Sequence, residues 1–247
     1  MKLLRFLRDG KMEHGVLEGK AVYELRERIT PPGRTPGALV GTLDELELLP
    51  PCEPSKIICA GHNYPWGENP SKSPEPKMFF KPPTTLIGSG GAVVYPSQSD
   101  RVIYEIELAV VIGKMARNVP AKQARDYILG YTCANDVTAY DLFLRDGNTF
   151  RAKSFDTFCP LGPVITTELD TKDLPIMCRI NGETRLSGST KGMYFSCEEL
   201  LSFTSSIMTL YPGDLILTGT PDVGPLQRGD AVEIEIPGIG ILRHTVV

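Results

Sequence analysis

The sequence predicts an α+β protein that is rich in β-strands and has few, short helices. Its 24 glycines and 21 prolines in 247 residues favour turns, so many short elements joined by loops are expected. Runs rich in Val and Ile recur along the chain, as is typical of strands, whereas helical signals are confined to a few segments. The length allows one full core together with a small accessory domain.

Composition excludes several classes of function. The net charge is −4 with no basic cluster, so nucleic acid is not an expected partner. No stretch approaches the roughly 18 apolar residues of a membrane span, and no signal peptide is visible, so a cytoplasmic protein is expected. The six cysteines form no C-x-x-C pair, which favours reduced, buried thiols over structural zinc or disulfides.

Residues 1–50 are predicted to form a small N-terminal β domain, and residues 51–247 the main domain. A strand at Lys2–Leu7 and a hairpin at Val16–Leu25 are expected in the first part, followed by a loop at 30–37. A short helical turn is expected within Thr42–Leu49, and the two prolines that follow at 50 and 51 end it. This part carries no residues that suggest chemistry.

The chemically suggestive stretch is a predicted strand at Tyr104–Gly113. Glu105 and Glu107 are two residues apart, so on a strand both side chains project from the same face. They interrupt an apolar run, and burying two like charges costs several kcal/mol unless something positive compensates. A divalent cation such as Mg²⁺ or Mn²⁺ is the simplest compensation, because hard cations prefer carboxylate oxygens.

A third carboxylate follows on the next predicted strand. Residues 120–130 are predicted to form a helix with Pro120 at its start and Gly130 at its end, and Tyr131–Thr138 a strand. A strand, a helix and a strand return the chain to the sheet, so Asp136 is placed near the two glutamates. The alternative is that Glu105 and Glu107 line the solvent face of an edge strand, and the spacing alone does not decide between the two.

The remaining segments complete a strand-rich chain. A capped helix is predicted over Ser196–Thr209, with Ser196 at its N-cap. The polar, proline-rich stretch Pro65–Lys77 is expected to be mobile. Glu233 and Glu235 form a second pair of spaced glutamates, which we interpret as the solvent face of a strand. Further strands are predicted at 55–61, 161–166, 176–183, 215–221, 231–237 and 240–246.

Four ordered motifs resemble the fumarylacetoacetate hydrolase family over residues 55–247. They are Y-E-I-E-L-A-V-V-I-G from residue 104, G-Y-T-C-A-N-D-V-T from residue 130, A-K-S-F-D from residue 152 and L-T-G-T-P from residue 217. The resemblance implies a mixed β-roll, a homodimer, and Mg²⁺ or Mn²⁺ bound by Glu105, Glu107 and Asp136. Some family members also carry a small N-terminal domain, as expected here.

The resemblance also implies a chemistry and further site residues. In the family a 2-oxo acid binds the metal, which stabilises an enolate. That enolate serves decarboxylation, proton relocation along a dienol, or C–C hydrolysis of an acylpyruvate. Lys153 matches the family lysine near metal and substrate, and Thr220 the residue that holds a substrate carboxylate. Asn63 and Tyr64 match the start of the family lid motif and are predicted to contact the substrate.

The chain departs from the family pattern at the lid. Family hydrolases show N-Y-x-x-H-x-x-E, whose histidine and glutamate activate water, whereas Gly67 and Pro70 stand at those positions here. His62 is the nearby substitute, and Glu68 or Glu75 are alternatives on the lid. Two further departures are Tyr140, where the family often has an arginine, and a segment after the T-G-T-P motif that is one residue shorter than usual.

These observations predict a metal-dependent enzyme that acts on small 2-oxo or 2-hydroxy-dienoic dicarboxylates. Without the water-activating pair, tautomerisation or decarboxylation is favoured over hydrolysis. The family includes the isomerase/decarboxylase of homoprotocatechuate breakdown, which handles 2-hydroxyhepta-2,4-dienedioate. Two alternatives stay open: an acylpyruvate hydrolase or oxaloacetate decarboxylase, and a degenerate member that binds metal and ligand without turnover.

Overall fold

A computed structural model of the chain describes residues 1–25, 36–65, 67 and 70–247. Strands hold far more of these residues than helices do, and the described helices are short, as the sequence predicted. The α-helices are α1 (Tyr140–Asp146), α2 (Phe150–Lys153) and α3 (Cys197–Ile207), and the 3₁₀ helices are η1 (Leu43–Glu45), η2 (Pro83–Thr85), η3 (Ala121–Tyr127) and η4 (Thr190–Gly192).

A sheet of 14 described strands forms the body of the molecule, and most of its strands follow the path β4-β3-β2-β1-β13-β11-β10-β16-β6-β7. On this path lie β1 (Lys2–Arg8), β2 (Lys11–Glu18), β3 (Ala21–Leu25), β4 (Pro36–Thr42), β6 (Ile57–Gly61), β7 (Lys77–Lys81), β10 (Val102–Ile112), β11 (Ile128–Asn135), β13 (Cys159–Thr166) and β16 (Leu215–Leu217). Beside the path lie β5 (Glu47–Leu49), β8 (Leu86–Ile87), β12 (Thr138–Ala139) and β17 (Val223–Leu226).

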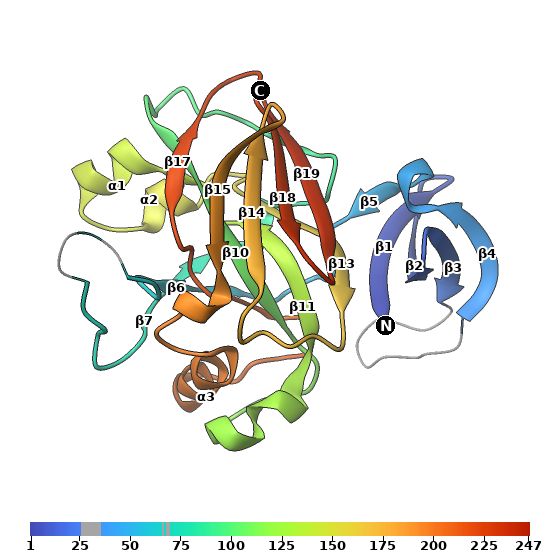
Figure 1. The fold of residues 1–247 in the computed structure, drawn as a ribbon, viewed down its shortest axis with the longest axis horizontal. Coiled ribbons are helices and arrows are strands. Elements are labelled where there is room, and N and C mark those ends of the chain that lie inside the picture. Colours follow the sequence, from blue (N-terminus) through green and yellow to red (C-terminus); the bar gives the residue numbers. More distant parts are fainter. Residues whose placement is uncertain (26–35, 66, 68–69) are drawn as a thin grey trace.

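A second sheet of five described strands crosses the first (Figure 1), in the order β15-β14-β18-β19-β9. Its members are β9 (Ala92–Val93), β14 (Pro175–Ile180), β15 (Glu183–Ser189), β18 (Ala231–Ile236) and β19 (Gly240–Val246). Both sheets contain parallel and antiparallel pairs, so both are mixed. The main core includes Leu108 and Val110 of β10 together with Cys178 of β14, Ile234 of β18 and Leu242 of β19.

Strand β10 is the centre of the larger sheet. It pairs along one edge with β11 and β12 and along the other with β16 and β17, so it is not an edge strand. Its residues from Val102 to Ile112 are buried except Glu105, which is partly exposed. Polar side chains on this strand therefore face protein rather than bulk water, which excludes the alternative of a solvent-facing edge strand.

The N-terminal strands extend the larger sheet from its β13 edge. Strand β1 pairs with β13, with β2 and with β5, and the group from β1 to β5 lies to one side of the main body (Figure 1). The hairpin predicted at Val16–Leu25 is formed by β2 and β3. Most of the predicted loop at 30–37 lies outside the described residues, and its last two residues begin β4.

The helix predicted at Ser196–Thr209 is confirmed as α3. Ser196 is its N-cap and accepts a hydrogen bond from the Glu199 N–H, while the Glu199 carboxylate accepts from the Ser196 N–H. This reciprocal pair satisfies two N–H groups that the first turn would otherwise leave without partners.

The helix predicted over residues 120–130 is wrong in its type and in its end. The segment forms the 3₁₀ helix η3, and Gly130 lies inside β11 instead of ending a helix. A Cβ atom at residue 130 would lie 2.4 Å from the Thr166 carbonyl oxygen of β13. Glycine is needed here because two backbones approach closely, a requirement that the sequence does not distinguish from a helix stop.

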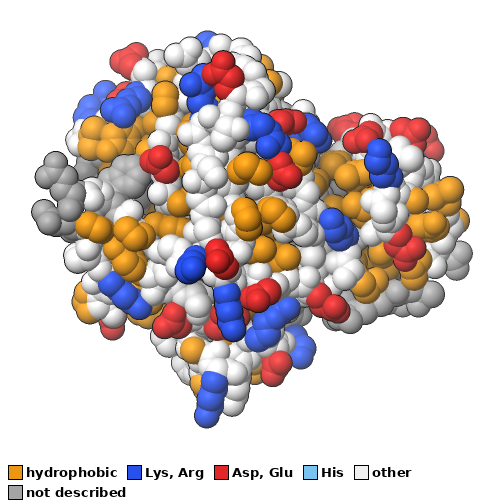
Figure 2. Space-filling view, viewed as in Figure 1, with side chains coloured by type: hydrophobic (Ala, Val, Ile, Leu, Met, Phe, Trp, Pro, Cys, Tyr) orange, Lys and Arg blue, Asp and Glu red, His pale blue; other side chains and the backbone are white. Residues whose placement is uncertain are grey.

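The surface carries charges of both signs. On the face in Figure 2, acidic and basic side chains are interspersed, with apolar side chains between them. Glu233 and Glu235 pair with Arg179, and Glu233 also pairs with Arg243. Both glutamates are partly exposed, on the face of β18 that was predicted to meet solvent. All six cysteines are buried and free. Among the described helices, none has the length and apolar character needed to cross a bilayer.

The close approach at Gly130 gives a prediction about stability. Gly130→Ala should lower the free energy of unfolding by about 1–3 kcal/mol, the usual cost of overpacking a core, because the new methyl group meets a rigid backbone oxygen. Urea denaturation measures this. Gly61→Ala is the matched control, since its Cβ would have no neighbour nearer than 3.7 Å. Equal midpoints for the two variants would contradict the packing argument.

Candidate active site

Three carboxylates meet at the junction of β10 and β11. Glu105 and Glu107 alternate with apolar residues along β10, so both project from one face. Strand β11 ends at Asn135, and the chain leaves it through Asp136, whose N–H donates to the Glu105 carbonyl oxygen at 2.8 Å. One carboxylate oxygen from each of Glu105, Glu107 and Asp136 lies within 4.8 Å of the other two.

Two buried lysines lie against these acids. Lys153 of α2 places its Nζ 2.8 Å from Glu105 Oε1 and 2.7 Å from Asp136 Oδ2. Lys81, at the end of β7, places its Nζ 2.7 Å from Asp136 Oδ1 and donates to the Val137 carbonyl oxygen at 3.0 Å. Neither ammonium group reaches Glu107, so one carboxylate of the three lacks a lysine partner.

The pKa values follow from burial and charge. Burial would raise the pKa of Asp136, but the charges of Lys153 and Lys81 outweigh it and lower that pKa. Burial would lower the pKa of Lys153, but the charges of Asp136 and Glu105 raise it instead. Burial, together with the charges of Asp136 and Glu105, raises the pKa of Glu107 well above its ordinary value. The cluster therefore lacks positive charge at Glu107.

Neutral donors fix the orientation of the glutamates. The Thr138 hydroxyl donates to Glu105 Oε1 at 2.5 Å, and the Gly219 N–H donates to Glu107 Oε2 at 2.6 Å. Gly219 has a φ of +90°, and a Cβ there would lie 2.9 Å from the Asn63 Cβ. Glycine is therefore required where the backbone turns its N–H toward Glu107.

The cluster fits a hard divalent cation. Its donor set is oxygen alone, which Mg²⁺ and Mn²⁺ prefer. Asp136 Oδ1 is buried and forms an ion pair with Lys81 Nζ at 2.7 Å, so that lysine supplies part of the compensating charge. The raised pKa of the buried Glu107 indicates a place where a cation would relieve the remaining electrostatic cost.

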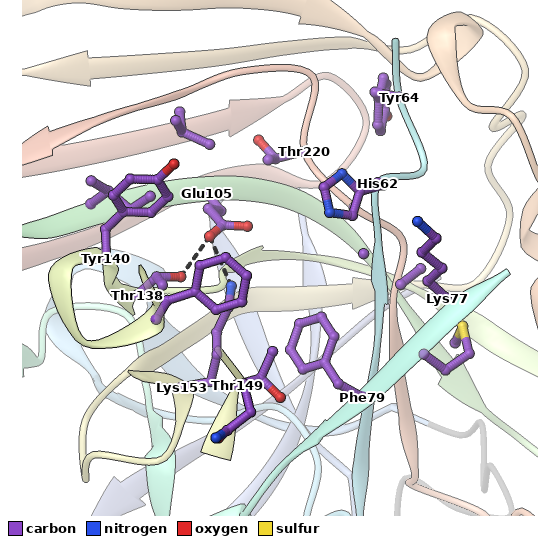
Figure 3. Close-up of a pocket in the computed structure, with 18 of the residues that line it drawn as sticks. His62, Tyr64, Lys77, Phe79, Glu105, Thr138, Tyr140, Thr149, Lys153 and Thr220 are labelled. Carbon is purple, nitrogen blue, oxygen red and sulfur yellow. Dashed lines mark hydrogen bonds and ion pairs between the residues drawn. The ribbon is translucent and has the colours of Figure 1, made fainter. Parts of the chain in front are cut away.

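A cavity of about 480 Å³ reaches the cluster at Glu105 (Figure 3), and Glu107 and Asp136 are not among the residues that line it. Glu105, Thr138 and Lys153 lie together on one side, joined by the hydrogen bonds drawn there. The walls are largely apolar and include Phe79, Ile103, Phe143 and Val223. Such a volume suits a small organic acid, with polar groups gathered at one end and apolar walls around the rest.

His62 and Tyr64 line this cavity, as predicted for site residues, whereas Asn63 does not. His62 has a φ of +54°, a conformation that is uncommon for residues other than glycine and that often marks a functional position. The Asn63 amide donates to the Phe195 and Thr218 carbonyl oxygens and accepts from the Phe195 N–H. In this structure Asn63 therefore anchors the segment that carries His62 and Tyr64.

Tyr64 and Thr220 differ in how their hydroxyl groups are used. The Tyr64 hydroxyl is buried and has no hydrogen-bond partner among the described residues, and burial raises its pKa. Thr220 lines the cavity, and its hydroxyl donates to the Asp222 carbonyl oxygen at 2.6 Å. The Thr220 side chain thus stabilises its own turn in this structure, and its predicted contact with a substrate carboxylate stays a prediction.

The lid residues are placed only in part. Glu68, one alternative base, lies outside the described residues together with 66 and 69, so the predicted mobility of 65–77 is not addressed. Glu75, the other alternative, is exposed and is not among the residues that line the cavity. Tyr140, which replaces the family arginine, does line the cavity, and the Arg101 guanidinium lies 4.7 Å from its ring centroid.

Sequence reasoning missed two members of the cluster. Lys81 is 1% exposed, yet lysines are rarely buried, so composition gave no reason to place it inside. A usable signal was its spacing, because Lys81 is two residues after Phe79 and therefore shares the face of β7 that reaches the cavity. Thr138 was part of a recognised motif, but a threonine gives no sign in sequence of the carboxylate that it contacts.

Comparison with known proteins gives the family. A profile described as "Fumarylacetoacetate (FAA) hydrolase C-terminal" matches residues 56–247, and one described as "Rv2993c-like, N-terminal" matches residues 1–51. An uncharacterized protein of Methanocaldococcus jannaschii is 52% identical over 198 residues, which are 78% of this chain and 84% of that protein. Human oxaloacetate tautomerase FAHD2A, mitochondrial, is 41% identical over 216 residues, 81% of this chain and 69% of that protein.

Two solved structures share the whole fold. The 5-carboxymethyl-2-hydroxymuconate delta-isomerase from Mycobacterium smegmatis has a TM-score of 0.91 at 40% identity, covering 100% of this chain and 99% of that one. The 2-hydroxyhepta-2,4-diene-1,7-dioate isomerase from Mycobacterium marinum has a TM-score of 0.88 at 37% identity, covering 100% of this chain and 98% of that one. The predicted resemblance and the predicted strand-rich fold are thereby confirmed.

The acidic cluster predicts a specific loss of cation binding. Glu107→Gln should weaken Mg²⁺ binding at least tenfold in calorimetry, because it removes a charged oxygen ligand and keeps the shape of the side chain. Glu233→Gln is the matched control, since Glu233 belongs to the other pair of spaced glutamates and contacts Arg179 and Arg243 instead. An unchanged Mg²⁺ affinity in Glu107→Gln would remove Glu107 from the metal site.

Proposed function

Because the chain belongs to the fumarylacetoacetate hydrolase family, we propose that it is a divalent-metal-dependent isomerase or tautomerase, with related decarboxylase activity, of small 2-oxo dicarboxylates. The observation that carries this proposal is the cluster of three carboxylates, of which Glu105 lines a cavity together with Lys153. When bound there, Mg²⁺ or Mn²⁺ would supply a Lewis acid that stabilises the negative charge of an enolate. The chain's own residues would then supply a fixed positive charge and a group that moves a proton.

Lys153 has the task of a fixed positive charge. The charges of Asp136 and Glu105 raise its pKa, so the ammonium group stays protonated and cannot act as the base. It lines the cavity and is 4% exposed, which keeps its charge unscreened by bulk water. A preorganised cation of this kind stabilises the charge that develops on the keto oxygen when a proton leaves the neighbouring carbon.

His62 has the task of moving that proton. It is the histidine that lines the described part of the cavity, and its unusual backbone conformation is held by the Asn63 anchor. Proton relocation takes a hydrogen from the carbon beside the keto group and returns it at oxygen or further along the chain of double bonds. An imidazole ring can accept a proton at one nitrogen and donate one from the other, so it can perform both steps.

The substrate class follows from charge and from the relatives. Lys77 lies at the cavity with His62 between it and Glu105 in the view of Figure 3, and it is exposed. With a divalent cation bound at the acidic cluster, the cavity would present positive charge both there and at Lys77, which would suit a molecule with two anionic ends. The named relatives are a tautomerase of oxaloacetate, an isomerase of a longer unsaturated dicarboxylate and an isomerase of an unsaturated tricarboxylate, which supports a substrate with at least two carboxylate groups for this chain.

Hydrolysis is the competing reaction, and the described lid residues disfavour it. Cleavage of an acylpyruvate needs a base that removes a proton from water beside the substrate. Gly67 has no side chain, Pro70 has no acid or base, and Glu75 does not line the cavity. Proton relocation and decarboxylation need no activated water, so both remain possible with the groups that the cavity presents.

The role of Lys153 predicts a large loss of turnover. Lys153→Met should lower kcat about 10²-fold or more, the usual effect of removing one electrostatic stabiliser, as measured by enol–keto conversion of oxaloacetate with Mg²⁺. Lys56→Met is the control, because Lys56 also pairs with a buried aspartate, Asp214, outside the residues that line the cavity. Wild-type turnover in Lys153→Met would show that Lys153 does not stabilise the charge of the enolate.

The missing water-activating pair predicts a preference among reactions. The ratio of kcat/KM for oxaloacetate or the dienol 2-hydroxyhepta-2,4-dienedioate to that for acetylpyruvate should exceed one, because hydrolysis alone needs the absent base. Each assay is run with Mg²⁺ and with Mn²⁺. The same experiment tests His62, since His62→Ala should depress proton relocation while leaving cation affinity unchanged.

Three outcomes would overturn this proposal. Clear hydrolysis of acetylpyruvate that His62→Ala abolishes would make the chain a hydrolase with His62 as its base. Hydrolysis that survives in His62→Ala would assign the base to the lid, where Glu68 and Glu75 are the candidates. Cation binding with no turnover of any of the substrates would identify a degenerate member of the family.

A further inference from the structure

A buried histidine outside the cavity contacts the residue that precedes a predicted metal ligand. His244 lies on β19 of the smaller sheet, is 2% exposed, and is not among the residues that line the cavity. Its Nε2 lies 3.0 Å from Nδ2 of Asn135, the last residue of β11 in the larger sheet. The contact therefore joins the two sheets directly behind the acidic cluster.

The hydrogen-bond network fixes the direction of this contact. Asn135 Oδ1 accepts the Glu105 N–H at 3.0 Å, which settles the orientation of the amide and leaves Nδ2 facing His244. His244 Nε2 must then be the acceptor, and the ring proton sits on Nδ1, 3.3 Å from the Thr245 carbonyl oxygen. Burial lowers the pKa of His244 to about 4, so the ring is neutral and its Nε2 lone pair is free to accept.

Asn135 in turn holds Glu105 against Asp136. The Asn135 side chain accepts the Glu105 N–H, and the next residue, Asp136, donates its own N–H to the Glu105 carbonyl oxygen at 2.8 Å. Both backbone groups of Glu105 are thus bound by neighbouring residues of one segment. The spacing between two of the three carboxylates depends on this pair of bonds and hence on the orientation of the Asn135 amide.

We propose that His244 is a positioning residue for the acidic cluster, which it serves by accepting a hydrogen bond from Asn135. The inference rests on the proposed metal-dependent function, because its consequence is the placement of Glu105 beside Asp136. Without an acceptor at His244 Nε2, the buried Asn135 amide loses a partner and its fixed orientation. Glu105 then loses the restraint on its N–H, and the three carboxylates no longer converge as closely.

The test compares variants that differ in the acceptor. His244→Phe keeps a ring and removes the acceptor, and should weaken Mg²⁺ or Mn²⁺ binding in calorimetry at least tenfold. His244→Gln places an amide oxygen near the former Nε2 position, where it can accept the same hydrogen bond. Its cation affinity should therefore stay within about threefold of that of the wild type. Rescue by glutamine is a result that a purely space-filling role of the histidine would not give.

A packing control separates positioning from general stability. Leu242 lies two residues away on the same face of β19 and is fully buried, so Leu242→Ala loosens the same strand without touching the acceptor. It should lower Tm and leave cation affinity unchanged. Equal weakening of cation binding in Leu242→Ala and His244→Phe would overturn the proposal, and so would wild-type affinity in His244→Phe.

Two readouts do not depend on metal or on activity. Hydrogen exchange at the Glu105 amide, measured without added cation, should be faster in His244→Phe and unchanged in His244→Gln. Nitrogen NMR of the wild-type ring at pH 7 should find the proton on Nδ1, whether or not any variant folds, and a proton on Nε2 would overturn the proposal. If the wild type binds no cation, the metal-dependent function fails, while the exchange and NMR results still decide the role of His244.

Discussion

The structure depends on the burial of like charges at one point. Glu107 and Asp136 are nearly inaccessible, Glu105 is close to them, and two lysines reach only part of the cluster. Burying like charges in this way costs several kcal/mol unless positive charge compensates them. The raised pKa of Glu107 shows that its negative charge is not fully compensated. Natural proteins keep an arrangement of this kind where charge has a use, and a cation of oxygen-preferring type would complete it.

Rigid elements hold this cluster, while the rim of the cavity comes from loops. Strand β10 is paired along both edges, so its backbone keeps the two glutamates on one face of the larger sheet. His62 instead lies in a turn after β6, which the Asn63 amide fastens to the backbone of Thr218 and Phe195. On the proposed mechanism, charge stabilisation and proton transfer belong to different parts of the fold, so changes in the loops would alter substrate preference without disturbing the acids.

The sequence was sufficient where a local pattern had one meaning. The alternation of Glu105 and Glu107 with apolar residues gave their shared face, and Ser196 with Glu199 marked the start of α3. Asp136 needed the family motifs, because only a tertiary path brings it to β10. The prediction for Gly130 was wrong because the sequence does not distinguish a glycine that ends a helix from one that allows a neighbouring backbone to approach closely. Lys81 and His244 belong to strands distant in sequence from the acids; the spacing of Lys81 from Phe79 indicated only a shared strand face, and no local pattern connected His244 to the cluster.

The two lysines restrict the mechanism that the cavity can support. Both lie against carboxylates, and for Lys153 these charges outweigh burial and hold its pKa above the ordinary value, so it provides positive charge rather than a base. On the proposed mechanism the proton must therefore be carried by a group at the rim, and His62 is the described residue with suitable chemistry. Catalysis by such a site is governed by how well negative charge is stabilised at its base. Reactions that share an enolate then differ only in which bond at the neighbouring carbon is broken. The same charge-stabilising groups can therefore serve tautomerisation, isomerisation and decarboxylation.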